Sequence, residues 1–491
     1  MKNKSGLFRM FFESKEVKAS TAYVICSVLQ KCITIITLPL FTRLLTTEEY
    51  GISTVYTSTM AVLIIFTTLN LPYGSFSTAM VKFENDRDGY MSSVITICAM
   101  FTMVYFVIYL LFRDFWNGLL DLPTVLMILM GFEMLLNTVI HFWMGKARFE
   151  YKYKALVAVS LVITIAGTCC SLLAVIFLPN KGVVKIIGSG IVICLVGSII
   201  LILTITKGRK CFNKTYWKYA LSFNIPLIPY YLSQVIFNQS DRLMINSMNG
   251  RSEAALYGVA YTIAFVLSFV LNAVNNSYVP WVYNKIKERS FQENKKVSVF
   301  IALVLAILLL GIIVLAPEIV LVMAGSKYMA SVWVIPPVAM SLLLLFYSQL
   351  FINLEFFFEE KHKLVAASVL AAGTNIVLNY YGIRMFGFVA AGYTTLISYF
   401  LFAGCNYLAM KKVCRNKGIS DNLYNYKALF LILVSLIVFG LGVTLLYSYR
   451  GIRFSIVLLG MLAALYFRKG IMGLLKSFGE REVEKSNRLL R

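Results

Sequence analysis

Residues 297–316 read VSVFIALVLAILLLGIIVLA, an unbroken run without a charged side chain. At a rise of about 1.5 Å per residue, a helix of this length crosses the roughly 30 Å hydrocarbon core of a bilayer. The whole chain fits the same environment, because 59% of its 491 residues are hydrophobic and only 14% are charged. About a quarter of the residues in a soluble protein are charged. The sequence therefore predicts an all-α integral membrane protein.

Similar apolar runs recur along the chain and predict fourteen transmembrane helices. The runs are too long for single strands and lack the alternation of a barrel wall, which favours helices. We place the spans at residues 19–41, 51–71, 90–112, 122–144, 155–178, 186–206, 219–243, 255–280, 297–316, 331–354, 364–383, 386–410, 427–448 and 454–467.

Lysine and arginine gather in alternate loops between the predicted spans. With the N-terminus inside, 35 of the 46 basic residues lie in inner segments, 10 lie in outer segments, and Lys31 lies within the first span. Basic residues are retained on the cytoplasmic side of membrane proteins, so both termini are predicted to be cytoplasmic. This topology explains most of the net charge of +23, and no nucleic-acid partner is implied.

The sequence shows no motif for catalysis or cofactor binding. It lacks a P-loop, an HExxH motif and a GxSxG motif, so we expect neither an ATP-driven pump on this chain nor a hydrolase. The nine cysteines and two histidines have no metal-ligand spacing. We expect no cofactor, no metal and no enzymatic activity.

Two related strings indicate an internal repeat. Residues 41–57 contain Phe-Thr-Arg-Leu-Leu followed by Tyr-Gly and Tyr-Thr, and residues 240–262 contain Ser-Asp-Arg-Leu-Met followed by the same two pairs. Six spans separate the copies, and an even number gives both the same orientation, as in secondary transporters built from two parallel halves. The predicted domains are a cytoplasmic N-terminal segment 1–18, a six-helix bundle 19–206, a cytoplasmic linker 207–218, a second six-helix bundle 219–410, two additional spans within 427–467 and a cytoplasmic tail 468–491.

Residues 38–51, LPLFTRLLTTEEYG, resemble the opening signature of bacterial polysaccharide repeat-unit flippases. These are the O-antigen and capsule exporters of the multidrug/oligosaccharidyl-lipid/polysaccharide superfamily. Further stretches resemble the same family in the same order along nearly the whole chain. They are residues 225–229 with 241–245, residues 315–328, and residues 375–391.

The resemblance implies a fold, a cargo and a location. The fold would be two six-helix bundles forming a V around a central cavity, with two additional C-terminal helices. The cargo would be an oligosaccharide repeat unit linked to a polyprenyl pyrophosphate, turned from the inner to the outer leaflet of the bacterial cytoplasmic membrane by alternating access. Membrane lipids would surround the protein, and the polysaccharide polymerase and glycosyltransferases are further candidate partners.

Polar side chains inside the predicted spans mark the candidate cargo site. Lys31 lies about halfway along the first span, where a charge costs about 2.5–3.5 kcal/mol and normally faces the bundle interior or a wet cavity. A cation flanked by amides and hydroxyls suits both a pyrophosphate and a sugar chain. The candidate cargo-binding residues are Ser27, Gln30, Lys31, Thr34 and Arg43 near or in the first span, and Gln234, Asn238, Asp241 and Arg242 in the seventh.

These residues also have structural interpretations. An ion pair with Glu133 is the alternative role for Lys31, and an interfacial anchor is the alternative role for Arg43. The predicted buried carboxylates Glu133 and Glu355 are candidate sites for a coupling proton or cation, with structural pairing as their alternative.

Two other classes of function compete with a flippase. A cation-coupled multidrug antiporter of the same superfamily is the main alternative, because a fold alone does not determine the cargo. Such an exporter is expected to carry a carboxylate in the middle of the first span, where this chain has Lys31. A membrane glycosyltransferase or polymerase would require paired acidic residues beside a large external loop, and we find no such loop in the sequence.

Overall fold

The computed structural model describes residues 15–288, 290–358, 361–418 and 423–466. All regular elements within these ranges are helices, as predicted. Most of the predicted N-terminal segment 1–18 and the whole predicted tail 468–491 lie outside the described residues.

The N-terminal half is built from long helices joined by short ones. The long helices are α2 (Lys15–Leu44), α3 (Thr47–Thr68), α5 (Arg87–Leu111), α7 (Thr124–Phe149), α8 (Tyr153–Phe177) and α9 (Lys181–Gly208). The short ones are α4 (Phe76–Lys82), η1 (Glu84–Asp86) and α6 (Arg113–Leu120). Helix α10 (Lys214–Asn224) and η2 (Ile225–Leu227) then lead to the second half.

The C-terminal half begins at α11 and is followed by two further helices. Its elements are α11 (Ile228–Asn249), α12 (Arg251–Ala264), η3 (Phe265–Leu267), α13 (Ser268–Lys287), α14 (Phe291–Val314), α15 (Ala316–Met323), η4 (Ser326–Val334), α16 (Ile335–Phe357), α17 (Lys361–Phe386) and α18 (Ala390–Asn416). The two further helices are α19 (Tyr426–Thr444) and α20 (Arg450–Tyr466).

The described helices are those of a multi-pass membrane protein. Eleven of the described helical segments are long and apolar enough to cross a membrane, by length and composition. The central part of every predicted span lies in a helix. The predicted spans 364–383, 386–410 and 454–467 correspond to α17, α18 and α20, which are not among the eleven.

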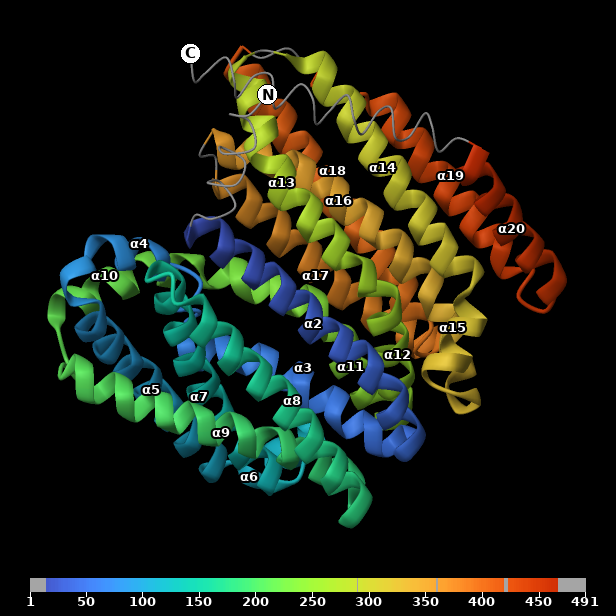
Figure 1. Ribbon diagram of the computed structural model, residues 1–491. Coiled ribbons are helices and arrows are strands. Elements are labelled where there is room, and N and C mark those ends of the chain that lie inside the picture. The colour runs from blue at the N-terminus through green and yellow to red at the C-terminus, as the bar shows by residue number, and fades with distance from the viewer. Residues whose placement is uncertain (1–14, 289, 359–360, 419–422, 467–491) are drawn as a thin grey trace, which may run out of the picture.

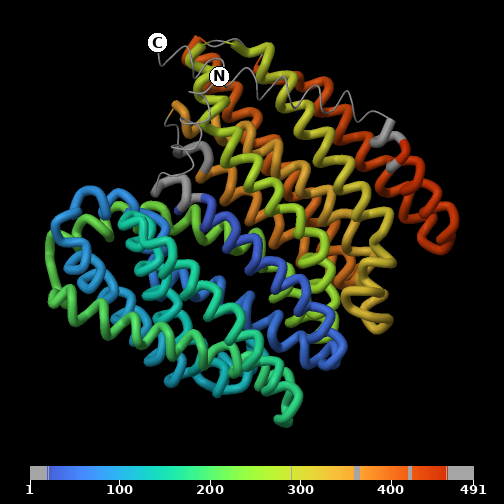
Figure 2. The backbone as a smooth tube through the Cα atoms, in the orientation of Figure 1, coloured from blue at the N-terminus to red at the C-terminus, as the bar shows by residue number. Residues whose placement is uncertain are grey.

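The helices form two groups that diverge like the arms of a V (Figure 1). Helices α2 to α9 make up one arm and α11 to α20 make up the other, and the arms separate toward the end where α4 and α10 lie. The chain passes from one arm to the other through the green segment between α9 and α11 in Figure 2. The predicted fold class is confirmed.

The two arms contact each other at the end opposite α4 and α10. Helix α3 packs against α11 and α12. Ser252 Oγ donates a hydrogen bond to Thr47 Oγ1 (2.6 Å), and the Arg251 guanidinium donates to Asp121 Oδ1 (2.7 Å). The charge distribution predicts that this end faces the cell exterior, and we call it the outer end.

Two glycines allow the helix backbones to approach closely at the outer end. A Cβ added to Gly51 in α3 would overlap the backbone carbonyl oxygen of Arg251 at the start of α12. A Cβ added to Gly258 in α12 would lie 2.8 Å from Cγ2 of Thr54 in α3. Both contacts are closer than van der Waals distance, so a larger residue at either position would force neighbouring atoms to shift, and at Gly51 those atoms are backbone.

The predicted seventh span, 219–243, is two helices. Its first part, α10, packs against α5 of the N-terminal arm. The Asn224 amide at the end of α10 donates to Ser75 Oγ (2.8 Å), and Tyr216 OH donates to Asp86 Oδ2 (2.6 Å). The break falls at η2, where Pro226 removes a backbone donor from the helical ladder. The connection between the arms therefore lies at residues 225–227, beyond the predicted linker 207–218.

The predicted eighth span, 255–280, is also interrupted. Helices α12 and α13 are separated by η3.

Helix α20 is joined to α15 through Arg453, which is 1% exposed and binds both carboxylate oxygens of Glu318 at 2.5 and 2.8 Å. Such bidentate geometry is the strongest arrangement of a guanidinium and a carboxylate.

Candidate functional site

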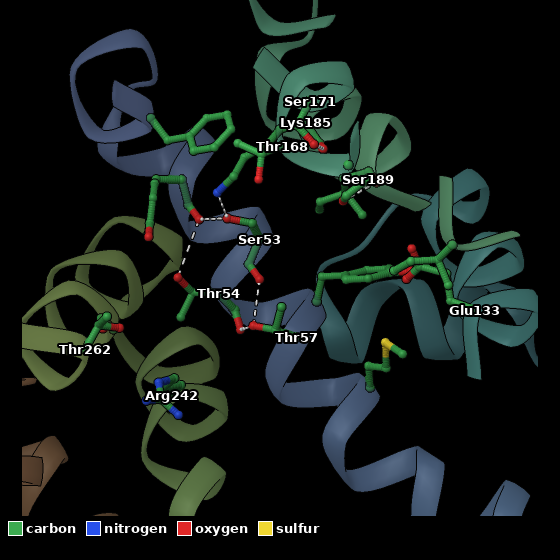
Figure 3. A pocket seen from close by; sticks show the side chains of 18 of the residues that line it. Ser53, Thr54, Thr57, Glu133, Thr168, Ser171, Lys185, Ser189, Arg242 and Thr262 are labelled. Carbon is green, nitrogen blue, oxygen red and sulfur yellow. Dashed lines mark hydrogen bonds between the residues drawn. The ribbon is translucent and has the colours of Figure 1, made fainter. Parts of the chain in front are cut away.

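A cavity of about 620 Å³ lies where the N-terminal arm meets α11 and α12 (Figure 3). Helices α2, α3, α7, α8 and α9 supply most of its wall, and α11 and α12 supply the rest. The lining residues are Phe41, Tyr50, Ser53, Thr54, Tyr56, Thr57, Met60, Glu133, Asn137, Gly167, Thr168, Ser171, Lys185, Ile186, Ser189, Ile193, Gln239, Arg242, Gly258 and Thr262. Cavities of this size accommodate small-molecule ligands and cofactors.

Helix α3 presents a strip of hydroxyl groups to the cavity. The helix begins with a capping box, in which Glu49 N donates to Thr46 Oγ1 (3.1 Å) and Thr46 N donates to Glu49 Oε2 (2.8 Å). This box fixes the start of α3 at the outer end. Ser53, Thr54 and Thr57 follow within the next turns and lie along the cavity wall in Figure 3.

Lys185 places a positive charge on the α9 side of the cavity. Its Nζ donates to Ser53 Oγ (2.8 Å) and lies 4.2 Å from the centroid of the Tyr50 ring and 4.8 Å from that of Phe41. Ammonium groups are attracted to aromatic ring faces at such distances. Ser171 Oγ of α8 donates to the backbone oxygen of Lys185 (2.7 Å), and Thr168 of the same helix also lines the cavity.

Arg242 supplies a second positive charge from α11, in the other arm. Its Nη1 donates to Gln239 Oε1 (2.5 Å) and to the backbone oxygen of Asn238 (3.0 Å), and its guanidinium carbon lies 4.3 Å from the Tyr261 ring centroid. Gln239 also accepts a hydrogen bond from Ser58 Oγ of α3 (3.1 Å). The guanidinium is thus held against the seam between the arms, where it lines the cavity.

Glu133 is the acidic side chain among the lining residues. It is 3% exposed, and it accepts a hydrogen bond from Tyr56 OH (2.6 Å). Gly190 of α9 makes room for the carboxylate, because a Cβ at that position would lie 2.5 Å from Glu133 Oε1. The predicted burial of Glu133 is confirmed, and its partner among the described residues is Tyr56, with no ion pair to Lys31. The lining therefore carries two basic side chains and one acidic side chain.

The residues of the predicted polar face of the first span contact two different neighbours, and none of them lines the cavity. Lys31 is exposed on α2, and its Nζ lies 4.6 Å from the ring centroid of Phe269 in α13. Gln30 donates to Thr164 Oγ1 of α8 (3.0 Å), and Thr34 Oγ1 donates to the backbone oxygen of Gln30 (3.0 Å). Ser27 is exposed on the same helix.

The remaining candidates from the first and seventh spans bind protein groups. At the end of α2, Arg43 Nη2 donates to the backbone oxygen of Val322 (3.3 Å), a contact between the arms. Gln234 Nε2 donates to Ser368 Oγ of α17 (3.0 Å), and Asn238 Nδ2 donates to the backbone oxygen of Gln234 (2.7 Å). Arg242 is the cargo-site candidate that lines the described cavity.

Asp241 lies inside the C-terminal arm, 1% exposed, in a network of hydrogen bonds. Thr395 Oγ1 donates to its Oδ2 (2.8 Å), Asn379 Nδ2 donates to its Oδ1 (2.5 Å), and Tyr257 OH donates to its Oδ2. These donors come from α18, α17 and α12, so the carboxylate ties α11 to three neighbouring helices. Glu355 is likewise 1% exposed, on α16, and lies outside the cavity lining.

Sequence reasoning missed Lys185 and the hydroxyl strip of α3. Lys185 lies next to the predicted start of the sixth span and was assigned to the outer loop, whereas α9 begins four residues earlier. A lysine at the edge of an apolar run is normally an interfacial anchor. Single serine and threonine residues in a membrane helix carry little signal, because their hydroxyls can bond to their own helix backbone.

Solved transporter structures share this fold. A lipid II flippase, MurJ in an inward closed conformation, aligns with a TM-score of 0.63 at 14% identity over 93% of this chain and 100% of its own. An inward-facing multidrug resistance MATE family transporter of the MOP superfamily aligns with a TM-score of 0.58 at 12% identity over 77% of this chain and 94% of its own. A mutant of the Vibrio cholerae MATE transporter VcmN gives 0.54 at 12% identity, over 83% and 98%.

The fold thus defines the class, a multi-pass membrane protein with the architecture of these transporters. No curated protein sequence matches the chain. The family described as "Polysaccharide biosynthesis protein" matches residues 17–285, more than half of the chain. The chain belongs to this family.

Proposed function

We propose that the protein is a flippase that moves polyprenyl-pyrophosphate-linked oligosaccharide repeat units from the inner to the outer leaflet of the bacterial cytoplasmic membrane. Its product would feed the synthesis of a surface polysaccharide, a capsule, O-antigen or exopolysaccharide. Both termini would lie in the cytoplasm, and the polysaccharide polymerase and glycosyltransferases would be partners. Membership of the polysaccharide biosynthesis family and the fold shared with a lipid II flippase support this proposal.

The observation that carries the proposal is the charge and lining of the cavity. Two cations, one from each arm, face a space lined with hydroxyl groups and a single carboxylate. A pyrophosphate is a concentrated anion that a guanidinium binds well, and hydroxyl groups exchange hydrogen bonds readily with a sugar chain. The excess of positive charge disfavours the cationic compounds that a multidrug antiporter would carry.

Transport would require the arms to exchange their open and closed ends. In this structure the arms meet at the outer end and diverge toward the end with α4 and α10. Cargo would enter from the cytoplasmic side, and the outer contacts would have to separate for release. Because the cavity is lined by both arms, its affinity for cargo would change as they move, which is the condition for a ligand to shift a conformational equilibrium.

Transport by purified protein tests this proposal. The full chain would be reconstituted into liposomes containing polyprenyl pyrophosphate linked to a fluorescent oligosaccharide, and transfer would be followed by protection of the sugar from an external glycosidase. We expect the protein to accelerate transfer and Arg242→Gln to slow it about tenfold or more, the loss typical of a charged hydrogen bond.

The matched control is Arg384→Gln. Arg384 also lies beside a tyrosine, with Nη1 3.3 Å from Tyr380 OH, but it is exposed at the end of α17 and does not line the cavity. Its replacement should leave the rate unchanged. Failure of the unmodified protein to move the lipid-linked sugar would refute the flippase proposal, and transport of ethidium in the same liposomes would favour the antiporter instead.

A further inference from the structure

Lys185 is a half-buried cation whose partners within the described residues are all neutral. Its ammonium has three N–H donors. One binds the Ser53 hydroxyl, and the rings of Tyr50 and Phe41 lie beside the group. No carboxylate lies within ion-pair distance of Lys185 in the described part of the chain.

Other lysines of low exposure have carboxylate partners. Lys146 binds Asp88 at 2.5 Å, and Lys285 binds Glu293 at 2.5 Å, with both lysine side chains 13% exposed. Removing an ammonium from water is costly unless an anion compensates its charge. No carboxylate among the described residues therefore compensates the charge of Lys185.

The surroundings of Lys185 indicate what kind of group would compensate it. The charge faces the cavity, and the hydroxyls of Thr168, Ser171 and Ser189 lie on the same side of the space in Figure 3. Ser171 Oγ donates to the backbone oxygen of Lys185 (2.7 Å) and Ser189 Oγ donates to that of Ile186 (3.0 Å). The donors left for a ligand are therefore the remaining N–H groups of the Lys185 ammonium, and these suit an anionic oxygen. Arg242 lines the same cavity from α11, in the other arm.

We propose that Lys185 is a subsite for an anionic oxygen of the cargo, a carboxylate or phosphate that its ammonium group binds. This inference rests on the proposed function and specifies the same cavity further. The anion would belong either to an acidic sugar of the repeat unit or to the lipid pyrophosphate. In both cases the cargo supplies the charge that the described protein groups around Lys185 lack.

Binding to the full chain in lipid nanodiscs tests the subsite. The first probe is polyprenyl pyrophosphate carrying N-acetylglucosamine, a neutral sugar, and the second is the same lipid carrying glucuronic acid. Affinities would be measured for the unmodified protein, Lys185→Gln, Lys185→Arg and the control Lys82→Gln. Lys82 also lies over a tyrosine ring, 4.5 Å from the centroid of Tyr219, but is exposed and outside the cavity lining.

Two results would support the subsite and identify the anion. If Lys185→Gln weakens both probes by about tenfold or more, Lys185 binds the pyrophosphate, and if it weakens only the glucuronic acid probe, Lys185 binds the sugar carboxylate. In each case Lys185→Arg should retain most of the affinity, because charge is the requirement. Lys82→Gln should bind like the unmodified protein.

One result would overturn the subsite without touching the proposed function. If the unmodified protein binds the probes and Lys185→Gln binds each probe with the same affinity as the unmodified protein, Lys185 does not contact an anion of the cargo. Thermal unfolding of each variant in the nanodiscs separates lost folding from lost binding, and Lys185→Arg serves as the second variant if Lys185→Gln is unstable. If the unmodified protein binds neither probe, the proposed function itself fails.

Discussion

Gly51 allows the two arms to close at the outer end, and its replacement should open them. A Cβ at this position would overlap the carbonyl oxygen of Arg251 and lie 2.9 Å from the Arg251 Cβ. The obstacle is backbone, which cannot rotate away. The overlap exists only while the arms touch, so Gly51→Ala should penalise the closed outer end more than the fold of either arm.

The size of the effect follows from the kind of overlap. Inserting a methyl group into a well-packed contact costs about 1–3 kcal/mol. A penalty of that size on one conformation shifts its equilibrium about 5- to 150-fold toward the other. Gly258→Ala should shift it less, because the added Cβ would meet Cγ2 of Thr54, a side-chain atom at 2.8 Å.

Access to the cavity from outside measures this shift. Thr262 lines the cavity, so a cysteine placed there in a cysteine-free background would report when the outer end opens. The rate of labelling by a membrane-impermeant maleimide should rise about 5- to 150-fold with Gly51→Ala, as long as the open form stays a minority. The control is Gly404→Ala in α18, where an added Cβ meets nothing within 4 Å. Equal labelling rates for Gly51→Ala and the control, with both proteins folded, would refute the claim that Gly51 allows the arms to close at the outer end.

Three further predictions concern topology, the last helices and coupling. A cysteine replacing Lys181 should react with an impermeant reagent outside intact cells and one replacing Lys417 should not; equal labelling would contradict the topology. Partial burial raises the pKa of Glu318 in α15 but the hydrogen bond from Arg453 lowers it more, so the pKa lies below its ordinary 4.5. Glu318→Gln should cost about 3 kcal/mol by leaving a buried charge unpaired, and thermal melts should show this difference shrinking as the pH falls through the lowered pKa. Glu133→Gln removes a buried charge and should abolish any pH dependence of transport in the liposome assay, and an unchanged pH profile would exclude Glu133 as the coupling site.

The fold could be predicted because a bilayer imposes one strong requirement. Every backbone group in the hydrocarbon must be bonded internally, so long apolar runs become helices whatever their exact sequence. Hydropathy does not report where such a helix breaks. Pro226 in the seventh span indicates a position where the helix can break. The docking of α10 on the N-terminal arm cannot be predicted in this way, because Asn224 and Tyr216 lie far in sequence from their partners Ser75 and Asp86.

The cavity was harder to predict than the spans. Arg242 stood out among the polar residues of the seventh span, Glu133 stood out because a charge deep in an apolar run is costly, and both line the cavity. Lys31 stood out for the same reason as Glu133. Its helix, however, has polar side chains on two sides at this point, because Lys31 faces Phe269 of α13 whereas Gln30 faces α8. Which direction faces a cavity is decided by neighbouring helices that no local pattern specifies.

Under the proposed function, the position of the cavity next to the outer contacts would link cargo binding to the movement of the arms. Thr54 and Gly258 belong both to the cavity lining and to the contact between α3 and α12. Arg242 and Lys185 reach the same space from different arms, so two like charges face one cavity and an anion between them would reduce their repulsion. The separation of these charges must change when α3 and α12 part, and with it the affinity for an anion. A cargo that carries the matching negative charge therefore has a means to bias the conformation, whereas a neutral one would act only through its hydrogen bonds.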